Sequence, residues 1–202
     1  MRINCLLIAG CFAALAAHAA HGEVIMSNLD AADDVGGTLF GPDANTVFKA
    51  YGWTMPGDAY FLDAVTLRLA AYDQGEARVS IWEGETEPVN ELTVLDNPVG
   101  PGMKGYFNLD FTPAGSFTLE AGSTYWVYVE ALDGGGNGFL WGDTDPPTMP
   151  SGLGTSVGYL FNGNPSSFFN AVEISGTLVP APGALALFGL AALTRRRRRK
   201  LQ

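Results

Sequence analysis

The segment Y-F-L-D-A-V-T-L-R-L-A-A-Y, residues 60–72, decides the fold class, because it carries the clearest period-2 pattern in the chain. Successive side chains of a β-strand point to opposite faces of the sheet. We therefore predict a strand with an aliphatic face toward the core and a polar face toward solvent. The residues expected to face the core are Val65, Leu67 and Leu69, and those expected to face outward are Thr66 and Arg68.

Two other segments are expected to pair with their neighbours along the chain. Ala77–Glu83 alternates in the same way, and the turn residues 73–76 would join it to 60–72 as a hairpin. Tyr125–Leu132 is a further alternating run. A Gly/Asn/Asp turn follows it, and the short segment Gly138–Trp141 is expected to pair back.

Short alternating runs bounded by turn residues recur through the chain, and about ten strands are expected. With 26 Gly and 12 Pro, this pattern predicts an all-β fold, a two-sheet β-sandwich or jelly roll. Leu29–Phe40, rich in Asp and Gly, is expected to be a loop. One domain is expected over residues 20–178. The remaining predicted strands are Glu23–Ser27, Thr46–Met55, Val89–Leu95, Gly105–Phe111, Ser116–Leu119, Val157–Phe161 and Ala171–Leu178.

The N-terminus has the pattern of a secretory signal peptide over residues 1–19. One positive charge precedes an apolar core, Cys5–Ala17, and Ala17-His18-Ala19 is a cleavage site. The mature chain would begin near Ala20. A lipoprotein signal ending at Cys11 is the alternative, although it leaves only about six apolar residues before the cut, against the usual 7–15.

The C-terminus, residues 179–202, combines a proline motif, an apolar run and a basic cluster. Prolines keep a segment extended. The apolar run Gly183–Leu193, expected to be a short helix, is shorter than the roughly 20 residues that span a bilayer, and the basic cluster would stay on the cytoplasmic side. We expect a temporary membrane stop; an ordinary tail anchor that is never cut is the alternative. The motif is Val179, Pro180, Ala181, Pro182 and Gly183, and the basic residues are Arg195, Arg196, Arg197, Arg198, Arg199 and Lys200.

This three-part tail resembles the PEP-CTERM sorting tail, also catalogued as the ice-binding protein C-terminal domain, a label that carries no activity. The resemblance implies an exosortase, a membrane transpeptidase that cuts near Pro182 and passes the protein to the envelope or exopolysaccharide. The family's namesake motif has Glu between the prolines, where this chain has Ala181. The chain therefore resembles the V-P-A-P-G variant, which leaves the subtype of the sorting enzyme open.

Residues 27 to about 142 resemble the choice-of-anchor domains of exported bacterial proteins, most closely the R type. The resemblance implies a β-sandwich displayed on the envelope, with no known activity. It rests on Ser27-Asn28-Leu29, on the segment 60–69, on Val79-Ser80-Ile81-Trp82, on Phe107, Leu109 and Phe111, and on Leu119-Glu120-Ala121-Gly122-Ser123-Thr124-Tyr125-Trp126-Val127.

Charge is divided unevenly between the tags and the domain. All 21 acids lie between Glu23 and Glu173, together with four basic residues, which gives that part a formal charge of −17. Such a surface repels nucleic acid and anionic lipid. It favours solubility in a salty exterior, with a cation-binding surface as the alternative. The four basic residues are Lys49, Arg68, Arg78 and Lys104.

Several catalytic classes are excluded from the expected domain. Cys5, Cys11 and His18 lie in the signal, and His21 lies just past the cut. The domain therefore lacks the residues of Ser–His, Cys–His and His-ligated zinc mechanisms. A glycosidase pair of carboxylates is not excluded. We expect a protein that is not an enzyme and has no cofactor.

Calcium is the alternative to that expectation, because carboxylates in loops suit six to eight oxygen ligands. Neither acidic segment has the EF-hand spacing, and ordinary turn and surface aspartates are the simpler explanation. The candidate ligands are Asp30, Asp33 and Asp34 in one segment and Asp143 and Asp145 in another.

Aromatic residues offer a glycan-binding alternative. Trp82 and Trp126 fall on the face opposite the aliphatic residues of their strands, so that face is either exposed or a second buried face. Trp53 and Trp141 complete the set, and core filling is the simpler explanation for all four. Phe168-Phe169 is either an exposed tip or a plug for one end of the core.

The sequence thus predicts an exported envelope or matrix protein with a structural or surface role. A carbohydrate- or calcium-binding module is the first alternative, and a hydrolase the second. The expected partners are signal peptidase and the export machinery, an exosortase-like transpeptidase, the inner membrane through the tail, and exopolysaccharide, with no nucleic acid.

Overall fold

The structure is a computed structural model that describes residues 22–41, 44, 47–72, 77–100, 105–132 and 138–180. Strands make up 63% of these residues, which contain no α-helix and one short 3₁₀ helix, Leu29–Ala31. The all-β prediction is confirmed. The expected signal peptide, most of the sorting motif (Ala181, Pro182, Gly183), the apolar C-terminal helix and the basic cluster 195–200 lie outside the described residues.

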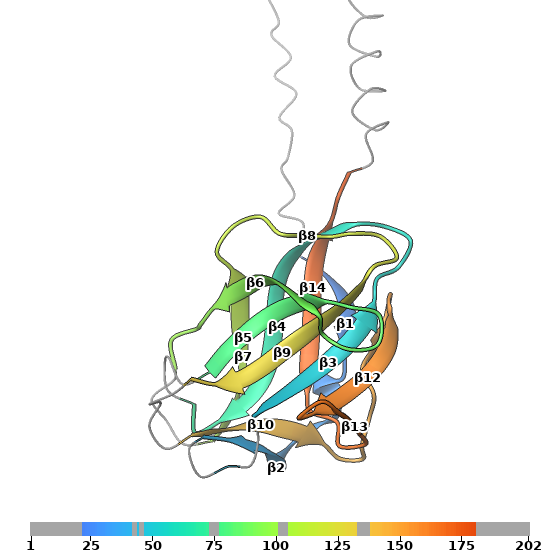
Figure 1. The fold of residues 1–202 in the computed structure, drawn as a ribbon. Coiled ribbons are helices and arrows are strands. Elements are labelled where there is room, and N and C mark those ends of the chain that lie inside the picture. The colour runs from blue at the N-terminus through green and yellow to red at the C-terminus, as the bar shows by residue number, and fades with distance from the viewer. Residues whose placement is uncertain are drawn as a thin grey trace, which may run out of the picture.

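The strands form one antiparallel sheet, shown in Figure 1. They are β1 (Glu23–Ser27), β2 (Ala32–Phe40), β3 (Phe48–Thr54), β4 (Tyr60–Ala70), β5 (Ala77–Glu83), β6 (Asn90–Asp96), β7 (Tyr106–Pro113), β8 (Thr118–Leu119), β9 (Thr124–Ala131), β10 (Phe139–Thr144), β11 (Ser151–Gly152), β12 (Thr155–Phe161), β13 (Asn164–Ser166) and β14 (Val172–Leu178).

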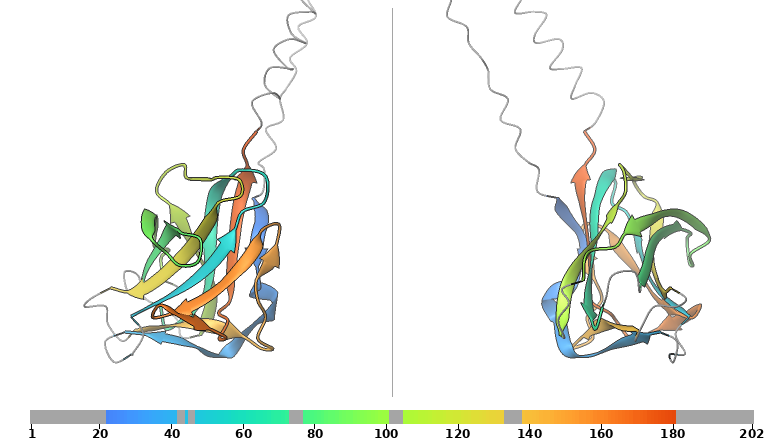
Figure 2. Two further views of the ribbon diagram at one scale, coloured as in Figure 1. Left: turned by 45° about the vertical axis from the view of Figure 1, so that its right-hand side comes forward. Right: turned by 90° about the vertical axis from the view of Figure 1, so that its left-hand side faces the viewer.

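The sheet curls around the core so that its two halves face each other (Figure 2). Its order is β11-β1-β14-β4-β7-β6-β5-β9-β3-β12-β13, with β8 and β10 on β4, and β2 on β10. Strand β6 links the halves, because it pairs with β5 and, through Leu95 and Asp96, with β7. Buried side chains of β4, β7 and β14 meet those of β3, β5 and β9 in one apolar cluster. This core fixes the positions of the strands that form the site described below.

Strand β4 confirms the predicted core face, whereas Thr66, which was predicted to face solvent, is only 8% exposed and donates to Asp110 Oδ1 at 2.7 Å. Val65, Leu67 and Leu69 are fully buried. Arg68 faces outward and pairs with an aspartate. The alternation changes phase near the start of the strand, because Leu62 is buried and Asp63 is exposed. An irregularity in the pairing with β14 lies at this point, and a bulge of this kind shifts the faces by one residue.

Two predicted pairings are wrong. Strand β4 does not form a hairpin with β5; it pairs with β14 and β7, while β5 pairs with β6 and β9 in the other half of the sheet. Strand β10 does not pair back onto β9; it pairs with β2 and β4. The alternation of side chains decides which face of a strand is buried, but it leaves the neighbouring strand undetermined.

The predicted loop over Leu29–Phe40 is also wrong, because most of this segment is strand β2. Its Asp and Gly residues favour turns in isolation. Pairing with β10 satisfies the backbone instead, with Phe40 opposite Phe139 and Gly37 opposite Gly142. A Cβ at Gly37 would lie 2.6 Å from the carbonyl oxygen of Trp141, so glycine allows the two strands to approach here.

A second, smaller apolar cluster lies on the outer face of β3, β9 and β12. It consists of Ala50, Trp126 and Leu160, and the half-buried rings of Phe48, Trp82 and Tyr128 pack against it. The indole N–H of Trp126 donates to the carbonyl oxygen of Gly84, 2.8 Å away. Both faces of β3 are therefore covered.

Gly52→Ala is expected to destabilise the protein by about 1–3 kcal/mol. Gly52 lies on the outer face of β3, and a Cβ there would come within 2.7 Å of ring carbons of Trp126. Urea unfolding of the full chain would measure the change. Gly57→Ala is the matched control, because its Cβ would meet nothing within 4 Å. Equal effects at the two glycines would contradict this packing.

Within the part of the chain that the structure describes, no helix has the length and apolar character needed to span a bilayer.

Candidate functional site

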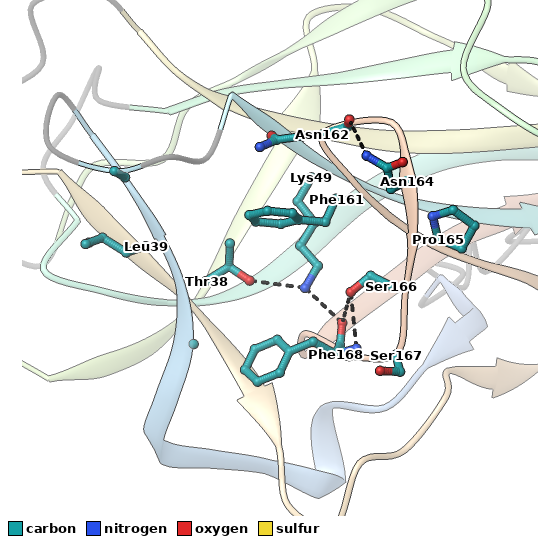
Figure 3. Close-up of a pocket in the computed structure, with 12 residues that line it drawn as sticks. Thr38, Leu39, Lys49, Phe161, Asn162, Asn164, Pro165, Ser166, Ser167 and Phe168 are labelled. Carbon is teal, nitrogen blue, oxygen red and sulfur yellow. Dashed lines mark hydrogen bonds between the residues drawn. The ribbon is translucent and has the colours of Figure 1, made fainter.

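A hollow of about 770 Å³ opens at the end of the sheet formed by β2, β3 and the β12–β13 hairpin (Figure 3). In Figure 1 this end lies opposite the one from which the chain leaves β14 at Leu178. The described residues that line it are Gly37, Thr38, Leu39, Ala44, Lys49, Phe161, Asn162, Asn164, Pro165, Ser166, Ser167 and Phe168.

Lys49 lies at the base of this hollow and is 0% exposed. It comes from β3, where alternation places it on the same face as the core residues Tyr51 and Trp53. Its Nζ donates to Thr38 Oγ1 at 3.1 Å and to the carbonyl oxygen of Phe168 at 2.8 Å. The aromatic rings of Phe168 and Tyr159 lie 4.7 and 5.6 Å from Nζ.

The charge of Lys49 has no carboxylate partner among the described residues, whereas Arg68 pairs with Asp34, and Arg78 with two glutamates. Burial lowers the pKa of Lys49 to about 7, and the negative charge of Asp143 opposes part of this effect. A neutral amine has two N–H groups, and the two oxygen acceptors satisfy both. The site therefore holds an amine that exchanges between charged and neutral forms near neutral pH.

A buried polar network holds Thr38 in place beneath Lys49. Its hydroxyl donates to Asn170 Oδ1 at 3.2 Å. The Nδ2 of Asn170, whose side chain is 0% exposed, donates to the carbonyl oxygens of Trp141 and Gly142. Buried polar groups are costly unless they are paired, so this network resists rearrangement.

Asn28 extends the network to β14. Its Nδ2 donates to the carbonyl oxygens of Thr148 at 2.8 Å and Asn170 at 3.1 Å, and its Oδ1 accepts from the backbone N–H of Val172 at 2.8 Å. The hydroxyl of Tyr159 donates to the same carbonyl oxygen of Asn170. The network thus joins the residue that follows β1 to β12, to β14 and to the segment before β14.

The pairing of β2 with β10 brings part of the predicted acidic set together. Asp33 lies against Asp143, and burial and the charge of Asp33 both raise the pKa of Asp143. Asp34 turns to Arg68 instead, while the backbone N–H of Asp145 donates to the carbonyl oxygen of Ala31. Residues 22–180, where described, contain no group of three His, Cys, Asp or Glu side chains that could hold a metal ion.

Trp53 and Trp141 are buried in the main core, so core filling is confirmed for these two, and Trp126 is buried in the smaller cluster on the outer face. Trp82 is half-buried on the outer face, where its ring stacks on Tyr128 with centroids 5.0 Å apart. Tyr128 in turn stacks on Phe48 at 4.5 Å. The rings cover one another's faces, and a flat sugar-stacking platform of four tryptophans is not formed.

Both expectations for Phe168-Phe169 hold, one for each residue. Phe169 packs against the core and stacks on Tyr159, with centroids 5.6 Å apart. Phe168 is 44% exposed and forms a wall of the hollow.

Lys49, Thr38 and Asn170 are site residues that were not predicted from the sequence. A signal existed for Lys49, because it alternates with Tyr51 and Trp53 in a strand that was predicted. Thr38 lies in the segment expected to be a loop. No known family model and no curated protein sequence matches this chain.

Proposed function

We propose that this chain is an exported, non-enzymatic envelope or matrix protein whose choice-of-anchor-like sandwich is sorted through its C-terminal tail by an exosortase-type transpeptidase. The structural observation that supports it best is the antiparallel pairing of β1 with β14, in which Glu23 lies opposite Gly176. Both ends of the domain therefore leave the same pole, as Figure 2 shows. A protein that is processed at both ends by membrane enzymes can then remain attached to the membrane through one pole.

The end of β14 suits the start of a processing motif. The backbone N–H of Val179 still donates to the carbonyl oxygen of Ala59, at 2.9 Å. Pro180 follows and has no N–H to continue the ladder. The domain thus holds the chain up to the first residue of the motif, and the sheet ladder ends where an enzyme would need an extended peptide.

In this proposal the signal peptide directs export and signal peptidase removes it near Ala20. The apolar tail then stalls in the inner membrane, with the basic cluster 195–200 on the cytoplasmic side. The transpeptidase cuts near Pro182 and transfers the domain to the cell surface or exopolysaccharide. The pole with the Lys49 hollow faces away from the membrane throughout.

The test is mass spectrometry of the mature protein from a host that carries an exosortase. We expect an N-terminus near Ala20 and a C-terminus near Pro182, without the basic cluster. Pro182→Ala is expected to slow this processing at least about tenfold, because the extended motif is lost. Asn164→Ala, an exposed residue of β13 at the opposite pole, is the matched control. A mature chain that still ends at Gln202 contradicts the proposal.

A binding module is the second candidate function, and the hollow favours it. Pockets that bind small ligands combine apolar walls with a few polar groups, as this hollow does with Phe161, Phe168, Asn164 and Lys49. The calcium alternative retains only the contact of Asp33 with Asp143. A rise in melting temperature on adding Ca²⁺ would support it.

A further inference from the structure

The walls of the hollow have the composition of a sugar site. The rings of Phe161 and Phe168 supply apolar surface for the C–H face of a pyranose. Asn164 and Ser167 are exposed at the rim and can exchange hydrogen bonds with hydroxyl groups. Sites for small ligands have volumes of about 300–1,000 Å³, and the 770 Å³ of this hollow suits one or two sugar units.

The base of the hollow favours a negative charge on that sugar. Protonated Lys49 has three N–H donors, of which two reach Thr38 Oγ1 and the carbonyl oxygen of Phe168. The charged amine otherwise faces the Phe168 ring. None of the lining residues that the structure describes is acidic, so an incoming anion meets no like charge on these walls. A carboxylate oxygen would supply a third acceptor and a negative charge in direct contact with the amine.

Access to Lys49 depends on Phe168. The ring of this residue lies over Nζ, but it is 44% exposed and so has room to turn toward solvent. Side-chain rotation of this kind is common when a binding surface meets its partner. The turned ring could then stack on the sugar whose carboxylate contacts Lys49.

We propose that this hollow binds a carboxylated sugar, such as a uronate unit of an acidic polysaccharide, with its carboxylate on Lys49 and its ring against Phe168. This inference goes beyond the proposed sorting function and does not depend on how the tail is processed. The negative charge of Asp143, which acts on Lys49, opposes an incoming anion, and so does the domain's net negative charge, which salt screens within about 10 Å.

Calorimetric titration of the full chain in detergent micelles tests the site. The probes are a hexamer of galacturonate, a neutral hexamer of glucose, and acetate. At pH 6 we expect the uronate hexamer to bind at least about tenfold more tightly than either control probe. Lys49→Met should weaken uronate binding at least about tenfold and leave binding of the neutral hexamer nearly unchanged. Arg78→Gln, which removes a cation on the other side of the sheet, is the matched control and should leave both unchanged.

The affinity for uronate should fall between pH 6 and pH 9, as Lys49 loses its proton. Two other titratable groups face this amine. Burial and the charge of Asp33 raise the pKa of Asp143 on β10, and burial raises the pKa of Tyr159 on β12 well above 10. The part of the pH dependence that Lys49→Met abolishes is therefore the part that Lys49 causes. Binding of uronate should in turn raise the pKa of Lys49, and NMR of ¹³C-labelled lysine would measure this rise.

Four results would each overturn the inference: no uronate binding at millimolar concentration, equal affinity for the neutral hexamer, equal affinity for acetate, or undiminished uronate binding by Lys49→Met. A loss of binding in Arg78→Gln as large as in Lys49→Met would also overturn it, since general attraction would then be the cause. The NMR measurement needs no variant, and a pKa of Lys49 that does not respond to uronate counts against the site. Tail processing enters none of these measurements.

Discussion

Lys49→Met is expected to raise the free energy of unfolding at pH 6 by about 2–4 kcal/mol. The wild-type protein holds a protonated amine, 0% exposed, without a carboxylate partner among the described residues. Methionine has a similar length and removes the cost of burying this charge. Part of the gain is offset, because Thr38 Oγ1 and the carbonyl oxygen of Phe168 lose a donor. Urea unfolding of the full chain at pH 6 measures the difference.

The advantage of Lys49→Met should shrink as the pH rises. The pKa of Lys49 is about 7 in the folded protein and 10.5 in the unfolded chain. Between these values the unfolded chain binds a proton that the folded protein does not, so wild-type stability rises with pH across this window. Below pH 7 both states are protonated, and the destabilisation is fully present. Unfolding at pH 6, 8 and 9.5 would show this trend.

Arg78→Met is the matched control for this experiment. Arg78 is paired with Glu91 and Glu130 on the outer surface, and its charge is kept over the whole interval. Its effect on stability should therefore be the same at pH 6 and 9.5. A Lys49→Met advantage that is also constant with pH would show that the buried amine is not the titrating group.

Asn170→Ala is expected to lower the free energy of unfolding by about 3–5 kcal/mol, because it leaves several buried groups unpaired at once. The Asn170 side chain accepts from Thr38 Oγ1 and donates to the carbonyl oxygens of Trp141 and Gly142. Alanine satisfies none of the three.

The control for Asn170→Ala is Asn164→Ala. Asn164 is exposed in β13, and its side chain donates a hydrogen bond to the carbonyl oxygen of Asn162 at 3.3 Å. A surface change of this type should stay within about 0.5 kcal/mol. Thermal or urea unfolding of both variants gives the comparison. Similar losses at the two positions would mean that the buried network carries no special stability.

Alternating patterns predicted the bounds and the buried face of a strand well where one face is apolar and the other is polar. Ala77–Glu83 has the predicted bounds, and Val79 and Ile81 lie in the core. The same reasoning failed for β2, where Asp and Gly residues conceal a strand that forms only because β10 pairs with it. The failure has a physical cause: turn propensity is a local preference, and a ladder of hydrogen bonds with a distant strand overrides it.

The site could be predicted only in part. The sequence separated Phe168-Phe169 as an aromatic pair and placed Lys49 within a strand. It could not show that β2, β3 and the segment before β14 bring Thr38, Lys49 and Asn170 into contact. The pKa of Lys49 follows from that contact, since desolvation depends on the residues packed around the amine.

The sequence by itself determined the all-β class, the faces of the regular strands and the absence of Cys and His from residues 22–180. These properties follow from composition and from the two-residue repeat of an extended backbone, both of which are local. Only the tertiary structure decided which strands are neighbours, that β1 and β14 bring both ends of the domain to one pole, and that Lys49 is enclosed at the other. Those outcomes depend on contacts between residues far apart in the chain, and no local repeat encodes them.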